Sequence, residues 1–177
     1  MADIRIHDKV FTPHISPEAI QERVAQLAEQ INAEYAGKNP LFIGILNGAF
    51  IFAADLFRNI SIDAEISFIK LASYKGTSST GNVITAIGME EKLNGRHVII
   101  VEDIIDTGKT LSAFMPEILQ RQPASVKIAT FLTKPSALKF PVKADYTAFE
   151  IADSFVVGYG LDYDGLGRNL PGLYILR

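Results

Sequence analysis

The chain has 177 residues, which suits one domain of ordinary size, and its 48% hydrophobic residues can form a substantial core. A net charge of −3 favours neither nucleic acid nor an anionic membrane, and the lack of cysteine excludes disulfides and cysteine-based zinc sites. With no signal-peptide pattern at the N-terminus and no apolar run near the roughly 18 residues of a membrane span, we expect a cytoplasmic protein.

A helix is predicted near the N-terminus. Residues 1–15 show only short apolar alternation and are expected to be irregular. Ser16 then suits an N-cap and Pro17 the first helical position. Apolar residues follow at helical spacing as far as Tyr35, and Gly37 is placed to end the helix.

The remaining predicted elements alternate between strand and helix. Strands are expected at 41–46, 60–71, 83–88, 97–101, 126–133, 146–151, 155–159 and 173–176, and helices at 49–58 and 108–120, with a kink or restart at Pro116. This alternation predicts an α/β fold with a mainly parallel central sheet flanked by helices. We expect a single domain over residues 1–177, with a core of about 38–150 and a small hood from about 1–15 and 151–177.

The most informative segment runs from Val98 to Thr110. A hydrophobic strand leads into two acids, two isoleucines and then Asp-Thr-Gly-Lys-Thr at the start of a helix, where backbone N–H groups can hold a phosphate. The closing Gly-Lys-Thr is similar to the end of an ATP-binding P-loop. That motif needs a glycine five residues before the Gly-Lys pair, and Asp103 stands there. A P-loop is therefore excluded.

Three acids in this segment indicate a sugar-phosphate ligand. Carboxylates would repel a triphosphate, whereas Glu102 and Asp103 can accept hydrogen bonds from vicinal hydroxyls, with or without a bridging metal. Asp106 lies further along, where it can act as a general base. The alternative is that the acids only end a strand and cap a helix. Their order around an apolar pair, immediately before the Gly-Lys-Thr helix start, favours the ligand site.

The thirteen residues resemble the phosphoribosyl pyrophosphate signature of type I phosphoribosyltransferases, and roughly Leu41–Asn169 resembles the hypoxanthine-guanine branch. The resemblance implies purine salvage: transfer of the 5-phosphoribosyl group to N9 of hypoxanthine or guanine, giving IMP or GMP and pyrophosphate. It also implies Mg²⁺ as cofactor and a homodimer or homotetramer. Asp106 would be the base for the purine N7 proton. The implied phosphoribosyl site comprises Glu102, Asp103, Asp106, Thr107, Gly108, Lys109 and Thr110.

Two further segments match parts of the family that contact pyrophosphate. Leu46-Asn47-Gly48 matches a loop that often carries a cis peptide, although Asn47 stands where Lys or Arg is frequent and Asn-Gly is also ordinary turn chemistry. Arg168 matches an arginine that contacts pyrophosphate, and Asn169 follows it where an aspartate is common. The resemblance therefore implies that Asn47, Gly48 and Arg168 bind pyrophosphate.

A loop rich in Gly, Ser and Thr extends from Ser73 to Asn82. Ser73-Tyr74 matches the start of a mobile lid that closes over the active site in the family. Such a lid would exclude water that competes for an oxocarbenium-like transition state. An ordinary surface loop is the alternative.

The implied purine site lies in the C-terminal half. Lys134 matches a lysine that donates to the purine 6-oxo group, which favours hypoxanthine or guanine over adenine. Phe155 matches the aromatic residue that stacks on the base, and Val156 the residue whose backbone meets the purine edge. Asp162 matches an acid linked to magnesium and completes the implied purine set. The implied metal residues are Glu102, Asp103 and Asp162, with Mg²⁺ bound largely through substrate oxygens and water.

Two alternatives remain open. The first is another type I phosphoribosyltransferase, acting on xanthine or a pyrimidine; Lys134 with Phe155-Val156 weighs against a pyrimidine. The second is a regulator of the same fold that binds nucleic acid and uses the loop as a sensor. The pI of about 5.6 and the presence of both Asp106 and Lys134 weigh against it.

Overall fold

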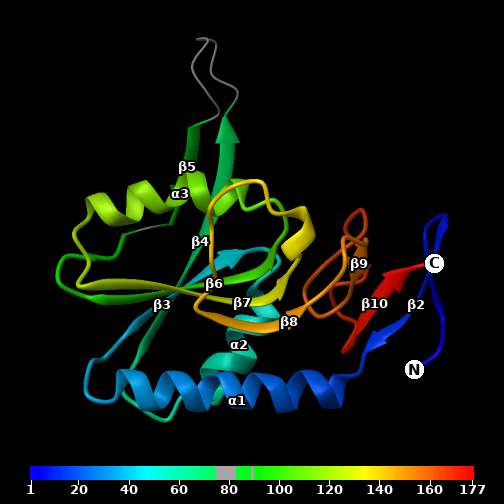
Figure 1. Ribbon diagram of the computed structural model, residues 1–177, viewed down its shortest axis with the longest axis horizontal. Coiled ribbons are helices and arrows are strands. Elements are labelled where there is room, and N and C mark those ends of the chain that lie inside the picture. Colours follow the sequence, from blue (N-terminus) through cyan, green and yellow to red (C-terminus); the bar gives the residue numbers. More distant parts are fainter. Residues whose placement is uncertain (75–82, 89) are drawn as a thin grey trace.

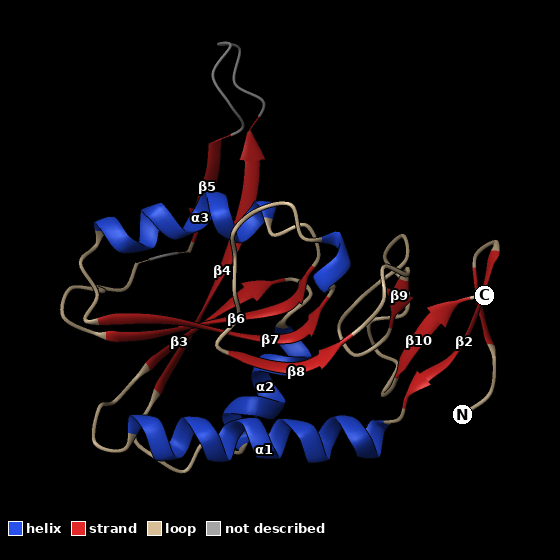
Figure 2. Ribbon diagram, viewed as in Figure 1, coloured by secondary structure: helices blue, strands red, loops and turns tan. Residues whose placement is uncertain are grey.

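Two sheets organise the chain in the computed structural model, which describes residues 1–74, 83–88 and 90–177 (Figures 1 and 2). The side chains of 72–74 and 83–87 lie outside this description. The strands are β1 (Ile4–Ile6), β2 (Lys9–Ile15), β3 (Leu41–Leu46), β4 (Glu65–Tyr74), β5 (Val83–Ile87), β6 (His97–Ile105), β7 (Ser125–Thr133), β8 (Tyr146–Glu150), β9 (Val156–Val157) and β10 (Leu173–Leu176). The helices are α1 (Pro17–Tyr35), α2 (Phe50–Arg58), α3 (Lys109–Gln120) and the 3₁₀ turn η1 (Pro135–Ala137).

The larger sheet, among the described residues, has the strand order β5-β4-β3-β6-β7-β8. The neighbours from β4 to β8 pair in parallel, and β5 joins the β4 edge in the antiparallel direction. The predicted α/β fold with a mainly parallel central sheet is confirmed. Because β6 is central, the loop after its carboxyl end lies where ligands bind in such sheets.

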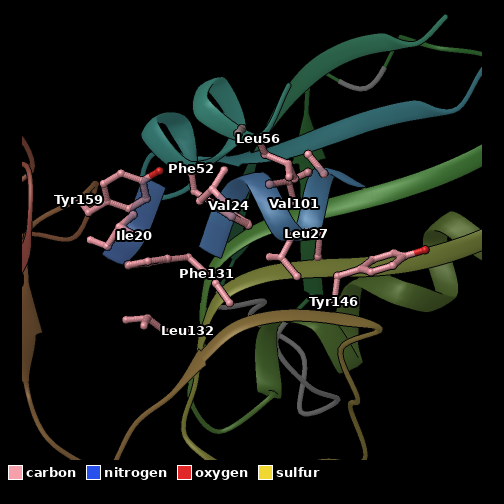
Figure 3. Close-up of a cluster of buried hydrophobic side chains, with 14 of the residues drawn as sticks. Ile20, Val24, Leu27, Phe52, Leu56, Val101, Phe131, Leu132, Tyr146 and Tyr159 are labelled. Carbon is pink, nitrogen blue, oxygen red and sulfur yellow. The ribbon is translucent and has the colours of Figure 1, made fainter. Parts of the chain in front are cut away.

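Helices cover both faces of this sheet: α1 and α2 lie on one side and α3 on the other (Figure 1). The first layer buries α1 and α2 side chains against β6 and β7, as the cluster around Phe52, Val101 and Phe131 illustrates (Figure 3). The second layer packs Leu111 and Phe114 of α3 on the opposite face. Successive side chains on the central strands point to opposite faces of the sheet, and both faces are buried. This explains the unbroken apolar runs of these strands.

Local signals for α1 act as predicted. The Ser16 hydroxyl accepts a hydrogen bond from the Ala19 backbone N–H at 3.2 Å, and Pro17 begins the helix. Arg23 then donates to the backbone carbonyl oxygens of Thr147 and Ala148, at 2.8 and 3.0 Å. These bonds fix α1 to β8 as well as to the core. Among the described residues, no helix is long and apolar enough to cross a membrane.

Both chain ends form the smaller antiparallel sheet, in the order β1-β2-β10-β9, called the hood sheet below. Figure 1 shows the N- and C-termini together on it. Phe11, Val157 and Tyr174 are buried between its strands. The expectation that residues 1–15 are irregular was wrong, because most of them form the β1–β2 hairpin. Its partner β10 lies at the other end of the sequence, so local periodicity could not reveal the pairing.

Some predicted boundaries also shift. β4 begins five residues later than expected, at Glu65, whereas β6 continues through its acids because the ladder to β7 includes Glu102 and Ile104. β9 has only two residues, since Gly158 adopts φ +101° and breaks the extended backbone. Pro116 lies inside one continuous helix, so the expected restart there was wrong.

Candidate active site

The loop from β6 to α3 encloses a cavity of about 260 Å³ at the carboxyl end of the sheet. Gly108 forms the N-cap of α3 at φ +78°, a conformation that favours glycine, so the helix opens with its N–H groups facing this loop. The Thr107 hydroxyl accepts from the Lys109 N–H at 3.3 Å, while the Thr107 carbonyl accepts from Lys139 and Phe140. The loop is thereby held against the segment after η1. Lys109 and Thr110 are exposed at the helix start.

Two adjacent acids, Glu102 and Asp103, line this cavity, and few neighbouring groups offset their negative charge. Glu102 is buried, and its Oε2 has no hydrogen-bond partner among the described residues. Burial, followed by the nearby charge of Asp103, raises the pKa of Glu102 well above its ordinary value. Burial also raises the pKa of Asp103 to about 6, although the Ile104 N–H donates to its carboxylate at 2.8 Å. Such a pair favours a cation or hydroxyl donors as a ligand.

Three chain segments meet at Gly48. The peptide bond before Asn47 is cis. A Cβ added to Gly48 would lie 1.4 Å from Asp103 Oδ2, and one added to Gly160 would lie 2.2 Å from the Gly48 carbonyl oxygen. The β3–α2 loop, β6 and the turn after β9 are therefore in close contact. Only glycine at position 48 permits this approach to the Asp103 carboxylate.

Arg168 lies in the segment between β9 and β10, called the hood turn below, and connects this segment to the contact between Gly48 and Asp103. Its Nη2 lies 2.6 Å from Asp162 Oδ1, and its Nη1 donates to the Gly160 carbonyl oxygen at 2.6 Å. The other carboxylate oxygen of Asp162 accepts from the Gly165 N–H at 2.8 Å. The positive charge of Arg168 opposes the rise in the Asp103 pKa, while the charge of Asp162 adds to it. The structure thus brings Gly48, Asp162 and Arg168 together around Asp103.

A second cavity, of about 170 Å³, adjoins the first and shares Asp103, Ile104 and Asp106 with it. Its other walls are formed by Lys134, Phe155, Val156, Leu161 and Asp162. Buried Lys134 places its Nζ 3.0 Å from Asp106 Oδ2 and 3.4 Å from Asp153 Oδ1. A hydrogen-bond donor and an acceptor therefore stand side by side at the edge of a partly aromatic cavity.

Asp153 and the residues that support Phe155 are not predicted from the sequence. Phe155 is 43% exposed, and its ring contacts Phe11 and Tyr163, with ring centroids 6.2 and 5.7 Å away. The Lys9 Nζ lies 5.4 Å from the Phe155 centroid and 4.5 Å from that of Tyr163. These contacts join residues far apart in the chain, and no local pattern signals them. An acid directly before the Ser-Phe pair was the one available hint of Asp153.

The expected lid cannot be placed in this site. Ser73 and Tyr74 end β4, but their side chains and residues 75–82 lie outside the described part of the structure. Asn47 is exposed at the β3–α2 loop, and the backbone of its neighbour Gly48 lies against the Asp103 carboxylate. Within the described residues, no group of three His, Asp or Glu side chains is arranged to hold a metal ion by itself.

The fold and site together define a type I phosphoribosyltransferase: a mainly parallel sheet whose central strand leads through two acids into the glycine-capped start of a helix, with a second, antiparallel sheet built from the chain ends. Residues 16–164 match the phosphoribosyl transferase domain family, and the chain belongs to that family.

The proteins similar to this chain include several hypoxanthine-guanine phosphoribosyltransferases. A hypoxanthine-guanine phosphoribosyltransferase of Streptococcus pneumoniae (strain ATCC BAA-255 / R6) is 44% identical over 164 residues, covering 92% of this chain and 91% of the relative. One from Bacillus subtilis (strain 168) is 43% identical with the same coverage. The crystal structure of a Bacillus anthracis hypoxanthine-guanine phosphoribosyltransferase superposes with a TM-score of 0.86 at 38% identity, covering 93% of this chain and 98% of that one.

Proposed function

We propose that this protein is a hypoxanthine-guanine phosphoribosyltransferase of purine salvage. It transfers the 5-phosphoribosyl group from phosphoribosyl pyrophosphate to N9 of hypoxanthine or guanine, and it releases IMP or GMP and pyrophosphate. The observation that carries the proposal is the 3.0 Å pairing of Lys134 Nζ with Asp106 Oδ2 in the smaller cavity. The 6-oxo oxygen and the N7 proton of these purines are neighbours on one edge of the base. A donor and an acceptor side by side complement that edge.

The base side of the reaction follows from these groups. Lys134 donates to the 6-oxo oxygen, Phe155 stacks on the ring and the Val156 backbone meets the purine edge. As N9 bonds to C1 of the ribose, the bond from C1 to pyrophosphate breaks and its electron pair leaves with the pyrophosphate. Asp106 accepts the N7 proton, so the nucleotide product is neutral at the base. An adenine 6-amino group would face the Lys134 donor and is rejected.

The phosphoribosyl side uses the larger cavity. Backbone N–H groups of residues 106–110, at the N-terminus of α3, bind the 5′-phosphate. Glu102 and Asp103 accept hydrogen bonds from the ribose hydroxyls, which supplies partners for the unpaired Glu102 oxygen. The backbone of Asn47-Gly48 and the Arg168 guanidinium hold pyrophosphate. Ser73-Tyr74 begins a lid that excludes water.

Magnesium fits this arrangement as a shared ligand of protein and substrate. Mg²⁺ prefers oxygen ligands and commonly uses one or two carboxylates together with substrate phosphates. Glu102, Asp103 and Asp162 offer carboxylate oxygens: Asp103 lies against Gly48, Glu102 precedes it on β6, and Asp162 is near enough for its charge to raise the Asp103 pKa. When bound, the ion would neutralise charge on the departing pyrophosphate. A homodimer or homotetramer in the cytoplasm, with one domain divided into core and hood, completes the proposal.

The test is nucleotide formation from phosphoribosyl pyrophosphate and Mg²⁺ with each of hypoxanthine, guanine, xanthine, adenine and uracil. We expect turnover of hypoxanthine or guanine and none of adenine. Asp106→Asn should lower kcat about 10²- to 10⁴-fold, because it removes the base while preserving shape. Turnover of xanthine or uracil alone would reassign the substrate. Binding of phosphoribosyl pyrophosphate without turnover of any base would favour a regulator.

A further inference from the structure

Lys134 is a buried ammonium group with two carboxylate partners rather than one. Its relative exposure is 7%, whereas the side chains of Asp106 and Asp153 are 48% and 65% exposed. A buried charge requires pairing, because leaving water costs free energy that only close opposite charges offset. Asp106, assigned above to the N7 proton, contacts the base and changes charge during the reaction. Asp153 has no such task in the proposed reaction.

The backbone around Asp153 is fixed to the strand that carries Lys134. The Ile151 N–H donates to the Thr133 carbonyl oxygen at 2.9 Å, and the Ser154 N–H donates to the Ala152 carbonyl oxygen at 2.8 Å. Thr133 directly precedes Lys134 at the end of β7. The carboxylate of Asp153 is therefore held at a defined place beside the ammonium, although it lies 19 residues along the chain.

The donors of Lys134 explain why a second carboxylate matters. An ammonium group has three N–H donors. Among the described groups, Asp106 takes one and Asp153 takes another, which leaves a donor for a ligand in the cavity. When Asp106 accepts the N7 proton, it loses the negative charge that attracts Lys134. Asp153 retains its charge at that moment.

We propose that Asp153 is a positioning residue that holds the Lys134 ammonium toward the 6-oxo oxygen while Asp106 turns to the purine N7. The inference rests on the proposed function and deepens it, because it assigns base recognition a residue from the segment that joins β8 to the hood sheet. Asp153 acts only through Lys134. Its loss therefore weakens the binding of the 6-oxopurine and leaves the binding of phosphoribosyl pyrophosphate unchanged.

A graded series of variants tests this role. Asp153→Ala removes charge and acceptor, Asp153→Asn removes the charge alone, and Asp153→Glu restores the carboxylate. We expect the KM for hypoxanthine to rise about fivefold in the alanine variant, the scale of a partly exposed ion pair. The asparagine variant should be intermediate and the glutamate variant close to wild type. KM for phosphoribosyl pyrophosphate should stay constant throughout.

Glu150→Ala is the matched control, since it truncates an exposed acid at the end of β8. It should leave both KM values unchanged. An unaltered KM for hypoxanthine in Asp153→Ala, or an equal rise in both KM values, would overturn the positioning role while the wild-type turnover upheld the proposed function. Failure of the wild-type protein to form nucleotide would refute the proposed function, and the inference with it.

Discussion

The part of the site proposed to bind phosphoribosyl pyrophosphate, called the phosphate side, and the part proposed to bind the purine, called the base side, are held in place by different kinds of contact. The phosphate side centres on one continuous segment, Glu102 to Thr110, at the end of a strand with fully buried neighbours, and Gly48 packs against Asp103 of that segment. The base side joins Lys134 of the central sheet to residues before and within the hood sheet. Its aromatic wall, Phe155, is supported by the N-terminal hairpin.

Because of this difference, the phosphate side should be rigid and the base side should be able to adjust. The β3–α2 loop meets β6 with no space for one methyl group at Gly48, so small changes there must move the backbone. The base side relies on a half-exposed ring and on ion pairs with exposed carboxylates, interactions that are individually weak. Substitutions on the phosphate side should therefore have large effects, and substitutions around Phe155 on the base side should produce graded effects on base binding alone.

The largest expected effect tests the close packing at Gly48. Gly48→Ala places a methyl group on the Asp103 carboxylate, so the loop and the acid must separate. A displacement near 1 Å lowers rates about hundredfold, and we expect that loss in kcat/KM for phosphoribosyl pyrophosphate. Steady-state kinetics with that substrate varied gives the value.

Gly37→Ala is the control for a glycine substitution as such. Gly37 also has a positive φ, but a Cβ there would meet no atom within 4 Å. The control should lose some stability, because alanine is strained at that φ, and keep its kinetics. Wild-type kcat/KM in Gly48→Ala would show that the phosphate side adjusts as easily as the hood.

The second prediction concerns stability and pH. Because burial raises the pKa of Asp103 from 3.8 to about 6, the folded state holds this proton more tightly than the unfolded state. The contribution of Asp103 to the free energy of unfolding is therefore greatest below pH 4 and is lost as the pH rises through about 6. Asp103→Asn removes this half-buried charge and should raise the free energy of unfolding by about 2 kcal/mol at pH 8.

Urea unfolding of wild type and Asp103→Asn at pH 4, 6 and 8 measures this trend. The advantage of the variant should shrink toward pH 4, while its KM for phosphoribosyl pyrophosphate rises at pH 8. If the variant is less stable than wild type at pH 8, the role of the Asp103 carboxylate is to stabilise the fold and not to bind the ligand.

The same division explains what the sequence could predict. The central strands were visible as apolar runs, and the Ser16 cap fixed the start of α1. The loop of Glu102 to Thr110 was recognisable because its residues act as neighbours in the chain. For these features, local chemistry determines local structure.

Contacts between distant segments could not be found in this way. The pairing of β2 with β10 joins opposite ends of the chain, and the strands are too short for periodicity to show it. Asp153 reaches Lys134 from a segment 19 residues away, whose Ile151 is hydrogen-bonded to Thr133. The close approach of Gly48 and Gly160 likewise depends on how the hood turn lies over the β3–α2 loop.

The smallest expected effect lies in the hood and sharpens the contrast with Gly48. Lys9→Met keeps an unbranched side chain, shorter by one atom, but removes the ammonium beside the rings of Phe155 and Tyr163. Such a contact at an exposed site contributes about 0.5–1 kcal/mol, so the KM for hypoxanthine should rise about two- to fivefold. Lys9→Arg retains a cation over the rings and should behave as wild type.

Hypoxanthine and phosphoribosyl pyrophosphate should be varied in separate kinetic series for both Lys9 variants. An unchanged KM for phosphoribosyl pyrophosphate in Lys9→Met would locate the loss at the aromatic wall. A parallel rise for both substrates would instead show that the β1–β2 hairpin supports the whole site. In that case the hood would share the rigidity of the phosphate side, and the two regions would differ only in how far apart their residues lie in the sequence.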